Sequence, residues 1–314
     1  MTATEPGTVL ITGPTRGLGR AAALAMAARP YRERPDLLLL GRPGAALEEV
    51  AEAVRVRGAR AHTIGCDLSR LDDVRAAAAG VRRLLDAGEV RPLRALVANA
   101  GAISPDTRLA SADGYEVTFA VSYLAHAQLI GDLLGALAAP ARIVLIGSNT
   151  YHPNLYRRLL GVPGAQWRDP VEVARPESGA TKPGFRASGV AYSTTKLAIL
   201  YYAHELQRRI EPGINVLVFE PGWMPGTALS RGTPPALQAL GRGLARLPGV
   251  ATPESSGPQL ASVALDDRYA QLRDGAFVVR GKVTEVLPVA LDRDRETRLW
   301  QATAELLDSE RAHR

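Results

Sequence analysis

The chain has 314 residues, 46% hydrophobic and 22% charged, a composition typical of a globular protein and not of a disordered one. The net charge is +6, but the basic residues are dispersed among Asp and Glu, so we expect solvated helix faces and no nucleic-acid-binding surface. The single cysteine, Cys66, excludes an intramolecular disulfide, and five scattered histidines give no metal-ligand spacing.

The N-terminal sequence predicts no signal peptide, because the first strand-like run begins within about ten residues of Met1. The longest weakly charged stretch, residues 117–141, contains His126, Gln128 and Asp132 at positions that suit an amphipathic helix better than a membrane span. We therefore expect a cytoplasmic protein with no membrane anchor, whose partner is a small-molecule substrate.

Short apolar runs alternate with longer helical patterns along the chain. The predicted strands and helices are, in order, 9–12, 18–28, 37–40, 45–57, 61–64, 71–85, 95–98, a helix ending near 138, 143–146, 190–210 and 216–219. Buried parallel strands are apolar throughout because helices cover both faces of their sheet. A last strand at 276–280 is expected to close one edge, and 293–309 to form a terminal helix. The fold class is therefore α/β, a doubly wound parallel sheet of the Rossmann type, in a single domain over residues 1–314.

Two segments interrupt this alternation, namely an insert at 149–189 and an irregular stretch at 221–252. Long loops inside compact domains are commonly lids or binding loops, so we expect the second stretch to be a substrate loop. Their aromatic and apolar side chains suit a bulky, largely apolar ligand, although packing of the loops on the domain explains them equally well. The residues predicted to bind substrate are Asn149, Tyr151, Trp223 and Met224.

A glycine-rich turn joins the first strand to the first helix. Its residues are Thr12, Gly13, Pro14, Thr15, Arg16, Gly17, Leu18 and Gly19. Such glycines allow a dinucleotide diphosphate to approach the backbone and lie on the helix N-terminus, where a Cβ would obstruct it. Glycines at a turn are weak evidence alone, but their position in the first βαβ unit favours a dinucleotide site.

The end of the second strand indicates the form of the cofactor. Enzymes that prefer NAD usually carry an acid there for the ribose 2′-hydroxyl, whereas an arginine suits a 2′-phosphate. Here the strand ends in Gly41-Arg42 without an acid, and Arg16 supplies a second guanidinium. Both could be surface arginines of an arginine-rich protein, but their two positions favour NADP(H).

Three motifs, in order and on matching elements, resemble the short-chain dehydrogenase/reductase family over roughly residues 8–310. They are the glycines Gly13, Gly17 and Gly19, then Asn99-Ala100-Gly101, then Tyr192-Ser193-Thr194-Thr195-Lys196. The resemblance implies that Asp67 and Leu68 contact the adenine. It also implies that the nicotinamide is flanked by Pro221, Gly222 and Thr227. Within the family, Glu205-Leu206 and the tail from Arg298 resemble the retinol dehydrogenase and protochlorophyllide reductase branch. Protochlorophyllide reduction itself is not expected, because the lone cysteine belongs to the adenine end.

The resemblance also implies a catalytic group of Ser148, Tyr192 and Lys196. Hydride transfer to a carbonyl leaves charge on oxygen, so an acid must donate a proton; Tyr192 would be that acid, or the base in alcohol oxidation. An unperturbed phenol titrates near pH ~10 and needs a neighbouring positive charge, which Lys196 supplies from four residues along the same helix face. Ser148, after the fifth strand, would hydrogen-bond the substrate oxygen.

One departure from the family pattern concerns the proton relay. Many members carry an Asn on the preceding helix that holds a relay water, and the matching residue here is Ser122. Serine reaches less far, which puts relay efficiency, or even ordinary redox turnover, in doubt. His126, one turn further along, is predicted to be a packed helix residue and not a replacement catalyst.

Together these residues predict reversible, NADP(H)-dependent interconversion of a carbonyl and an alcohol on an apolar or polycyclic metabolite, in specialised metabolism. Two alternatives stay open. Ser122 and the long insert motivate a cyclisation, isomerisation or dehydration without net redox, and a nucleotide-sensing binding module is the other alternative. The intact catalytic group argues against the binding module. Many family members pair through the helices beside strands four to six, so a homodimer and a monomer both remain open.

Overall fold

The computed structural model describes residues 6–153, 163–179, 184–224 and 250–312. At its centre is an eight-stranded sheet of order β3-β2-β1-β4-β5-β6-β7-β8. Its strands are β1 (Thr8–Thr12), β2 (Asp36–Gly41), β3 (Ala61–Gly65), β4 (Leu93–Ala98), β5 (Leu137–Ile146), β6 (Ile214–Glu220), β7 (Ala276–Val279) and β8 (Lys282–Val283). Strands β1 to β7 are parallel and β8 is antiparallel to β7. The predicted doubly wound Rossmann-type sheet is confirmed.

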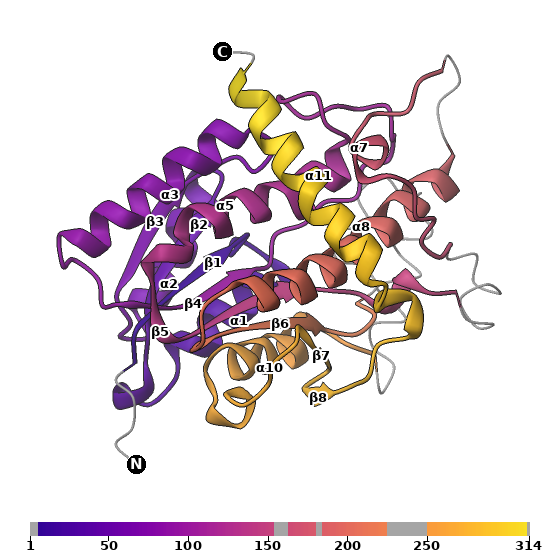
Figure 1. The fold of residues 1–314 in the computed structure, drawn as a ribbon. Coiled ribbons are helices and arrows are strands. Elements are labelled where there is room, and N and C mark those ends of the chain that lie inside the picture. The colour runs from indigo at the N-terminus through magenta and orange to yellow at the C-terminus, as the bar shows by residue number, and fades with distance from the viewer. Residues whose placement is uncertain (1–5, 154–162, 180–183, 225–249, 313–314) are drawn as a thin grey trace.

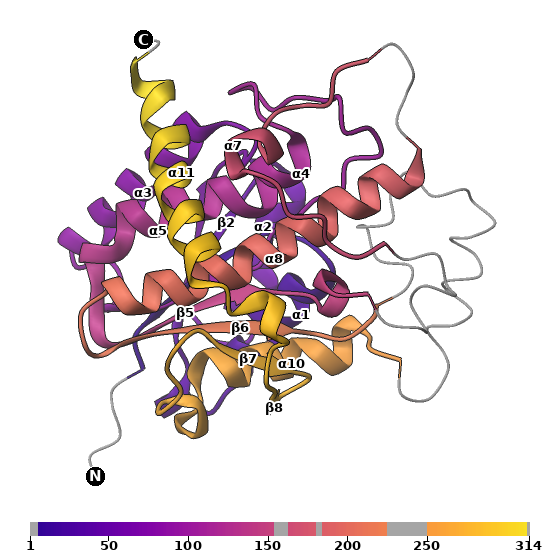
Figure 2. The ribbon, with the colours of Figure 1, turned by 45° about the vertical axis from the view of Figure 1, so that its right-hand side comes forward.

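Helices cover both faces of the sheet (Figures 1 and 2). One face carries α1 (Gly17–Ala27), α2 (Ala45–Arg55) and α10 (Pro253–Leu265). The other carries α3 (Leu71–Asp86), α5 (Ala125–Leu133), α8 (Phe185–Arg209) and α11 (Arg293–Ala312). Shorter helical pieces are η1 (Tyr31–Glu33), α4 (Val117–Phe119), the π-helical segment η2 (Ala120–Leu124), η3 (Leu134–Ala136), η4 (Asn149–Tyr151), α7 (Pro170–Val173), η6 (Asp267–Tyr269) and η7 (Pro288–Ala290).

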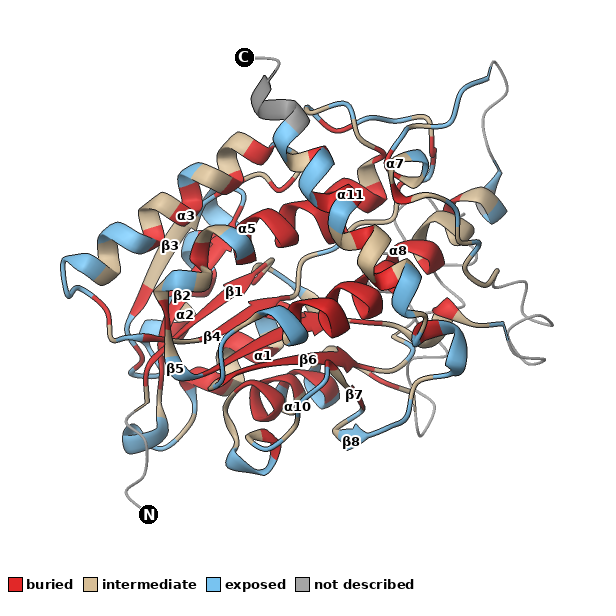
Figure 3. Cartoon of the chain, in the orientation of Figure 1, coloured by how far each residue is buried: buried red, intermediate tan, exposed pale blue. Residues whose placement is uncertain are grey.

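Successive residues of the central strands face opposite helix layers. Leu38 and Leu40 pack in the layer of α3, α5 and α8, whereas Leu37 and Leu39 pack in the layer of α1, α2 and α10. All four side chains are fully buried, and Figure 3 shows the inner strands as buried along their length. A parallel sheet covered on both faces needs an apolar residue at every position, which explains the unbroken apolar runs in the sequence.

Helix α10 has no counterpart among the predicted elements. It begins with a capping box, in which Thr252 accepts a hydrogen bond from Ser255 N and Ser255 Oγ reciprocates, and Pro253 occupies its first turn. Its Gly257 packs closely on α1, because an added Cβ would lie 2.5 Å from Ala21 Cβ. The capping residues were therefore the local signal for this helix.

Several predicted boundaries differ from the structure; helix α8, for example, begins at Phe185 and not near 190. The helix expected to end near 138 ends with η3 at Ala136, and β5 then starts at Leu137, six residues before the predicted strand 143–146. Near one edge of the sheet β7 ends at Val279, and Arg280 and Gly281, with φ of 49° and 82°, turn the chain into β8. The edge strand is therefore β8 and not the predicted strand 276–280.

The stretch Val117–Ala136 is long and apolar enough, by length and composition alone, to cross a membrane. However, 72% of its most apolar window is buried inside the fold. Its helices pack against α3 and α8 (Figure 1). The stretch is therefore a core element, in keeping with the amphipathic pattern of its sequence.

Helix α11 crosses α5 and α8 on the outside of the fold (Figures 1 and 2). Trp300 stacks on Tyr202 of α8, with ring centroids 5.7 Å apart and an angle of 15° between the rings. The Arg209 guanidinium lies 5.0 Å from the Trp300 ring centroid, and Tyr123 Oη is 2.5 Å from Thr303 Oγ1. The C-terminal helix is thus fixed to the layer that carries α8.

Candidate active site

The glycine turn lies where the strand order reverses, between β1 and β4, at the carboxyl ends of the strands. Gly13 has φ +64°, which other residues rarely adopt. A Cβ on Gly19 would lie 2.4 Å from both Gly13 O and Asn99 Nδ2. Gly17, with φ +53°, would direct a Cβ into open space, with no atom within 4 Å. Two of the glycines therefore shape the turn, and the third leaves room beside it.

The predicted Asn99-Ala100-Gly101 motif builds the wall next to this turn. Asn99 Nδ2 donates to Thr12 O at 2.8 Å and to Gly13 O at 3.3 Å. The backbone amides of Asn99 and Ala100 both donate to Thr12 Oγ1 at 2.9 Å. Gly101 follows, and a Cβ there would meet Ser122 Oγ at 3.4 Å. The motif thus fixes the end of β4 against the end of β1.

The turn fits the diphosphate of a dinucleotide. Helix α1 starts after Arg16, no side chain caps its N-terminus, and no acid occupies its first turn, so the helix end is suited to an anion. Gly17 leaves open the space that a Cβ would fill. Thr15 is half-buried and Leu18 is buried beside it, while the guanidinium-bearing residues Arg16 and Arg42 are both exposed at the ends of β1 and β2.

The other residues predicted to hold the cofactor lie at neighbouring strand ends. After β3, the Asp67 carboxylate accepts hydrogen bonds from Ser69 N and Ser69 Oγ at 3.0 and 2.8 Å, and Leu68 is buried. After β6, Pro221 O accepts from Ser256 Oγ at 2.8 Å, and Gly222 has φ +93°. Thr227 lies outside the described residues.

The predicted catalytic group comes together at the ends of β5 and β6. The Ser148 hydroxyl lies beside the Tyr192 phenol, whose pKa it lowers, and it accepts from Thr150 N at 3.3 Å. Lys196 is buried, lies 5.5 Å from the Tyr192 ring centroid and donates to Ile146 O at 2.7 Å. One helix, α8, carries both the phenol and the ammonium, and the carboxyl end of β5 supplies their partners.

Burial sets the protonation of this group. Burial raises the pKa of Tyr192 to about 12; the Ser148 hydrogen bond opposes this shift and the Glu220 carboxylate adds to it. Burial also lowers the pKa of Lys196 to about 8, which the negative charge of Glu220 partly offsets. At neutral pH the phenol therefore carries a proton that it can donate beside a cationic lysine.

Glu220 was not among the predicted site residues. It is the last residue of β6 and is buried. Val218 faces the α8 layer and Phe219 the opposite one, so the alternation of the strand directs Glu220 toward α8. The available sequence signal was the position of this carboxylate, directly before Pro221-Gly222 on a strand that is otherwise apolar.

Ser122 lies in the π-helical segment Ala120–Leu124, a rare geometry that often marks functional sites. Its hydroxyl donates to Ala102 O at 3.2 Å and accepts from Ala102 N at 3.1 Å. A hydroxyl has one donor and two acceptor positions, so one acceptor position remains for a relay water. Ser122 thus fixes the loop after Gly101. The family resemblance predicted only a role in the proton relay for this residue.

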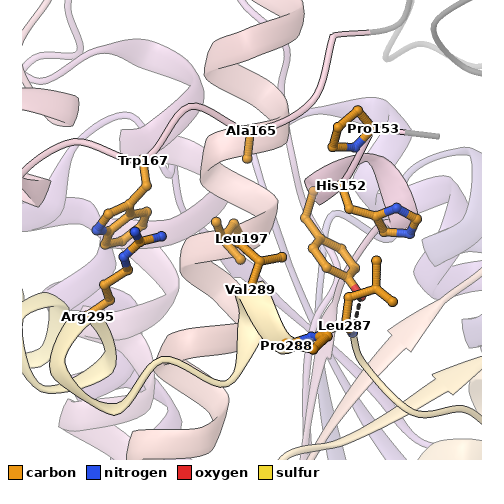
Figure 4. A pocket seen from close by; sticks show the side chains of 10 residues that line it. His152, Pro153, Ala165, Trp167, Leu197, Leu287, Pro288, Val289 and Arg295 are labelled. Carbon is orange, nitrogen blue, oxygen red and sulfur yellow. Dashed lines mark hydrogen bonds between the residues drawn. The ribbon is translucent and has the colours of Figure 1, made fainter. Parts of the chain in front are cut away.

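The structure packs Tyr151 against the segment that leads into α11. Its hydroxyl accepts from Leu287 N at 3.0 Å, and its ring packs edge-on against Phe277 with centroids 6.3 Å apart. It lines a pocket of about 370 Å³ between α8, the loop after η4 and the segment that leads into α11. Figure 4 shows His152 and Leu287 at one end of this pocket and Trp167 with Arg295 at the other.

The other predicted substrate residues lie in three surroundings. Asn149 is half-buried in η4, directly after Ser148. The Trp223 side chain is 57% exposed, at the start of the predicted substrate loop. Met224 packs against the layer of α1 and α10, and residues 225–249 of that loop lie outside the described residues. Asn149 is therefore the predicted substrate residue adjacent in sequence to the catalytic group.

Comparison with known proteins gives consistent matches. A family model described as short chain dehydrogenase matches residues 7–155. Retinol dehydrogenase 14 of Mus musculus is 31% identical over 93% of this chain and 83% of that protein. Protochlorophyllide reductase B of Oryza sativa subsp. japonica is 26% identical over 96% of this chain and 77% of that protein. The solved structure of an angucycline C-6 ketoreductase with bound NADP covers 88% of this chain and 94% of its own, at 24% identity and a TM-score of 0.63.

Proposed function

This chain belongs to the short-chain dehydrogenase/reductase family, in its retinol dehydrogenase and protochlorophyllide reductase-like branch. From that premise we propose that it interconverts a carbonyl and an alcohol on a bulky, largely apolar small molecule, with NADP(H) as cofactor. One observation carries the proposal: the Tyr192 phenol lies beside the Ser148 hydroxyl, which lowers the pKa of the phenol, and the Lys196 ammonium lies 5.5 Å from its ring. This arrangement suits proton donation to a developing oxyanion.

The residues divide the chemistry among them. When bound, the nicotinamide supplies or accepts the hydride at the reacting carbon. In the reductive direction Tyr192 donates its phenolic proton to the carbonyl oxygen, and Ser148 donates a hydrogen bond to the same oxygen. The Lys196 charge stabilises the phenolate that is left, so the step is less costly than it would be for an isolated phenol. In the oxidative direction the same phenolate accepts the alcohol proton.

Two observations support NADP(H) over NAD(H). Arg42 follows β2 directly, with no acid at the strand end, and Arg16 precedes α1; both are exposed. An arginine pair beside the adenosine ribose suits a 2′-phosphate, since guanidinium groups bind phosphate through two parallel hydrogen bonds. The angucycline ketoreductase of the same fold is solved with bound NADP.

The proposed substrate class is supported by the names of two similar proteins. That ketoreductase takes its name from polycyclic angucyclines, and retinol dehydrogenase 14 takes its name from an apolar alcohol. A polycyclic or long apolar ketone, of the kind made in specialised metabolism, is therefore the proposed substrate.

The test uses the purified full chain, NADPH and a set of polycyclic and aliphatic ketones. Consumption of NADPH together with a product heavier by two hydrogen atoms is the expected result. A product of unchanged mass, or one lighter by water, with no NADPH consumed, would instead support the non-redox alternative. Lack of NADPH binding would overturn the proposal outright.

A further inference from the structure

His126 lies at the centre of a hydrogen-bond network under the cofactor side of the sheet. It is 2% exposed. Its Nε2 atom is 2.9 Å from Thr12 Oγ1, and its Nδ1 atom is 3.3 Å from Ser122 O. The side chain thus joins the last residue of β1 to the π-helical segment, across 114 positions of sequence.

The hydrogen bonds of Thr12 determine which ring nitrogen of His126 carries the proton. The amides of Asn99 and Ala100 both donate to Thr12 Oγ1 at 2.9 Å, and these two bonds use both acceptor positions of the hydroxyl. The hydroxyl proton is therefore available only for His126, so Nε2 must be the acceptor. A neutral imidazole then carries its proton on Nδ1, which faces the Ser122 carbonyl.

The surroundings favour the neutral ring. Burial lowers the pKa of His126 to about 4; the Ser122 carbonyl opposes the shift and the Lys196 charge adds to it. Because the neutral form dominates at the pH of most metabolism, both hydrogen bonds persist there. The ring therefore links the Thr12 hydroxyl, which donates to Nε2, to the Ser122 carbonyl, which accepts from Nδ1.

The same hydrogen-bond network holds both ends of the loop at residues 99–102, beside the glycine turn. Thr12 holds the amides at the start of this loop, and the Ser122 hydroxyl holds both the N–H and the C=O of Ala102 at its end. His126 connects these two anchors, one through a side chain and the other through a backbone carbonyl. Fixing both anchors fixes the loop that faces the glycine turn.

We infer that His126 is a positioning residue: as the Nδ1–H tautomer it ties Thr12 to the Ser122 carbonyl and so holds residues 99–102 in the arrangement that binds the dinucleotide. The inference rests on the proposed function for the identity of the ligand. It assigns His126 no contact with the reacting atoms, so it is not a catalytic residue. The sequence predicted that His126 is only a packed helix residue. The positioning role differs from that prediction because it requires His126 to accept from Thr12 and to donate to the Ser122 carbonyl.

Two variants separate the two hydrogen bonds. His126→Gln can place its Oε1 near the position of Nε2 and still accept from Thr12. His126→Asn can place its Nδ2 near the position of Nδ1 and donate to Ser122 O, but it does not reach Thr12. Loss of one buried hydrogen bond corresponds to about a 2- to 10-fold change in an equilibrium. Because each variant keeps one hydrogen bond and breaks the link between Thr12 and the Ser122 carbonyl, we expect the NADPH dissociation constant to rise by about that factor in both.

A double-mutant cycle with Thr12→Val tests the path of the effect. If His126 acts through Thr12, the Asn substitution will weaken NADPH binding in the wild-type background and add nothing in the Thr12→Val background. Equal weakening in both backgrounds, or a wild-type dissociation constant in either the Gln or the Asn variant, would overturn the inference.

The tautomer itself is measurable without any dinucleotide. Nitrogen NMR of protein with ¹⁵N-labelled histidine, assigned by the signal missing in His126→Gln, is expected to show a protonated Nδ1 and an unprotonated Nε2. A proton on Nε2 would overturn the inference. Failure of the wild-type protein to bind NADPH would overturn the proposed function instead, so the two failures are distinguishable.

Discussion

The Lys196 ammonium lies 5.5 Å from the centre of the Tyr192 ring. Lys196 follows Tyr192 by four residues on the same helix. The ammonium also donates to Ile146 O at 2.7 Å, so its position is fixed from the sheet as well as from the helix. A cation held in this way lowers the cost of forming a phenolate nearby. This pair is the basis of the expectations for catalysis.

Removing the phenolic hydroxyl is expected to abolish most turnover while leaving cofactor binding intact. Tyr192→Phe keeps the ring but loses the proton donor beside Ser148. General acid catalysis contributes about 10²- to 10⁴-fold, so kcat should fall by that factor. Steady-state kinetics and an NADPH fluorescence titration check this, with Tyr202→Phe on the same helix as control. Wild-type turnover in Tyr192→Phe would contradict the assignment.

Carbonyl reduction is expected to decline as pH rises through about 8. The pKa of Lys196 is lowered to about 8 and that of Tyr192 is raised to about 12, so the lysine loses its proton first while the phenol remains protonated. The profile of kcat/KM against pH measures this decline. A profile that stayed flat to pH ~10, the ordinary range of these groups, would rule out the assigned role of Lys196.

Glu220→Gln should move that decline to lower pH. The Glu220 carboxylate raises the pKa of Lys196 by favouring the charged ammonium, and its removal lowers that pKa further. The same removal lowers the pKa of Tyr192, because the carboxylate disfavours the phenolate. The exposed Glu285→Gln serves as the matched control and should leave the profile in place. An unshifted profile in Glu220→Gln would show that this carboxylate does not act on the pair.

Cofactor preference is expected to depend on the two arginines at the ends of β1 and β2. Arg42→Ala and Arg16→Ala should each raise KM for NADPH by about 10- to 100-fold, the range for hydrogen bonds to charged groups, and leave KM for NADH unchanged. Arg57→Ala, also exposed but in the turn that follows α2, is the control. Equal losses for both cofactors would indicate a general effect on the fold and not recognition of a 2′-phosphate.

Docking of the C-terminal helix is expected to depend on Trp300. Its ring stacks on Tyr202 and lies under the Arg209 guanidinium. Truncation of a large aromatic side chain in such a contact costs about 3 kcal/mol, so Trp300→Ala should lower the free energy of unfolding by that amount. Urea denaturation measures it, and the exposed neighbour Gln301→Ala should change the value by less than ~0.5 kcal/mol. Equal stabilities of the two variants would show that the helix is held by other contacts.

The features that the sequence determined are those with a local cause. Leu37 to Leu40 must be buried on both faces, which requires a parallel sheet between two helix layers. The turn glycines need positive φ or close approach, and the four-residue spacing of Tyr192 and Lys196 places them on one face of whatever helix they form. Helix α10 also has a local signal in the sequence, its capping box at Thr252.

Tertiary structure decided which distant side chains meet. His126 reaches Thr12 only because β1 and α5 pack together, and Glu220 acts on Lys196 only because α8 packs against β6. Tyr151, predicted to line the substrate site, turns its hydroxyl toward Leu287 at the far end of the chain. Residue type and periodicity fix backbone geometry over a few positions, whereas hydrogen-bond direction and pKa depend on neighbours that sequence spacing does not encode.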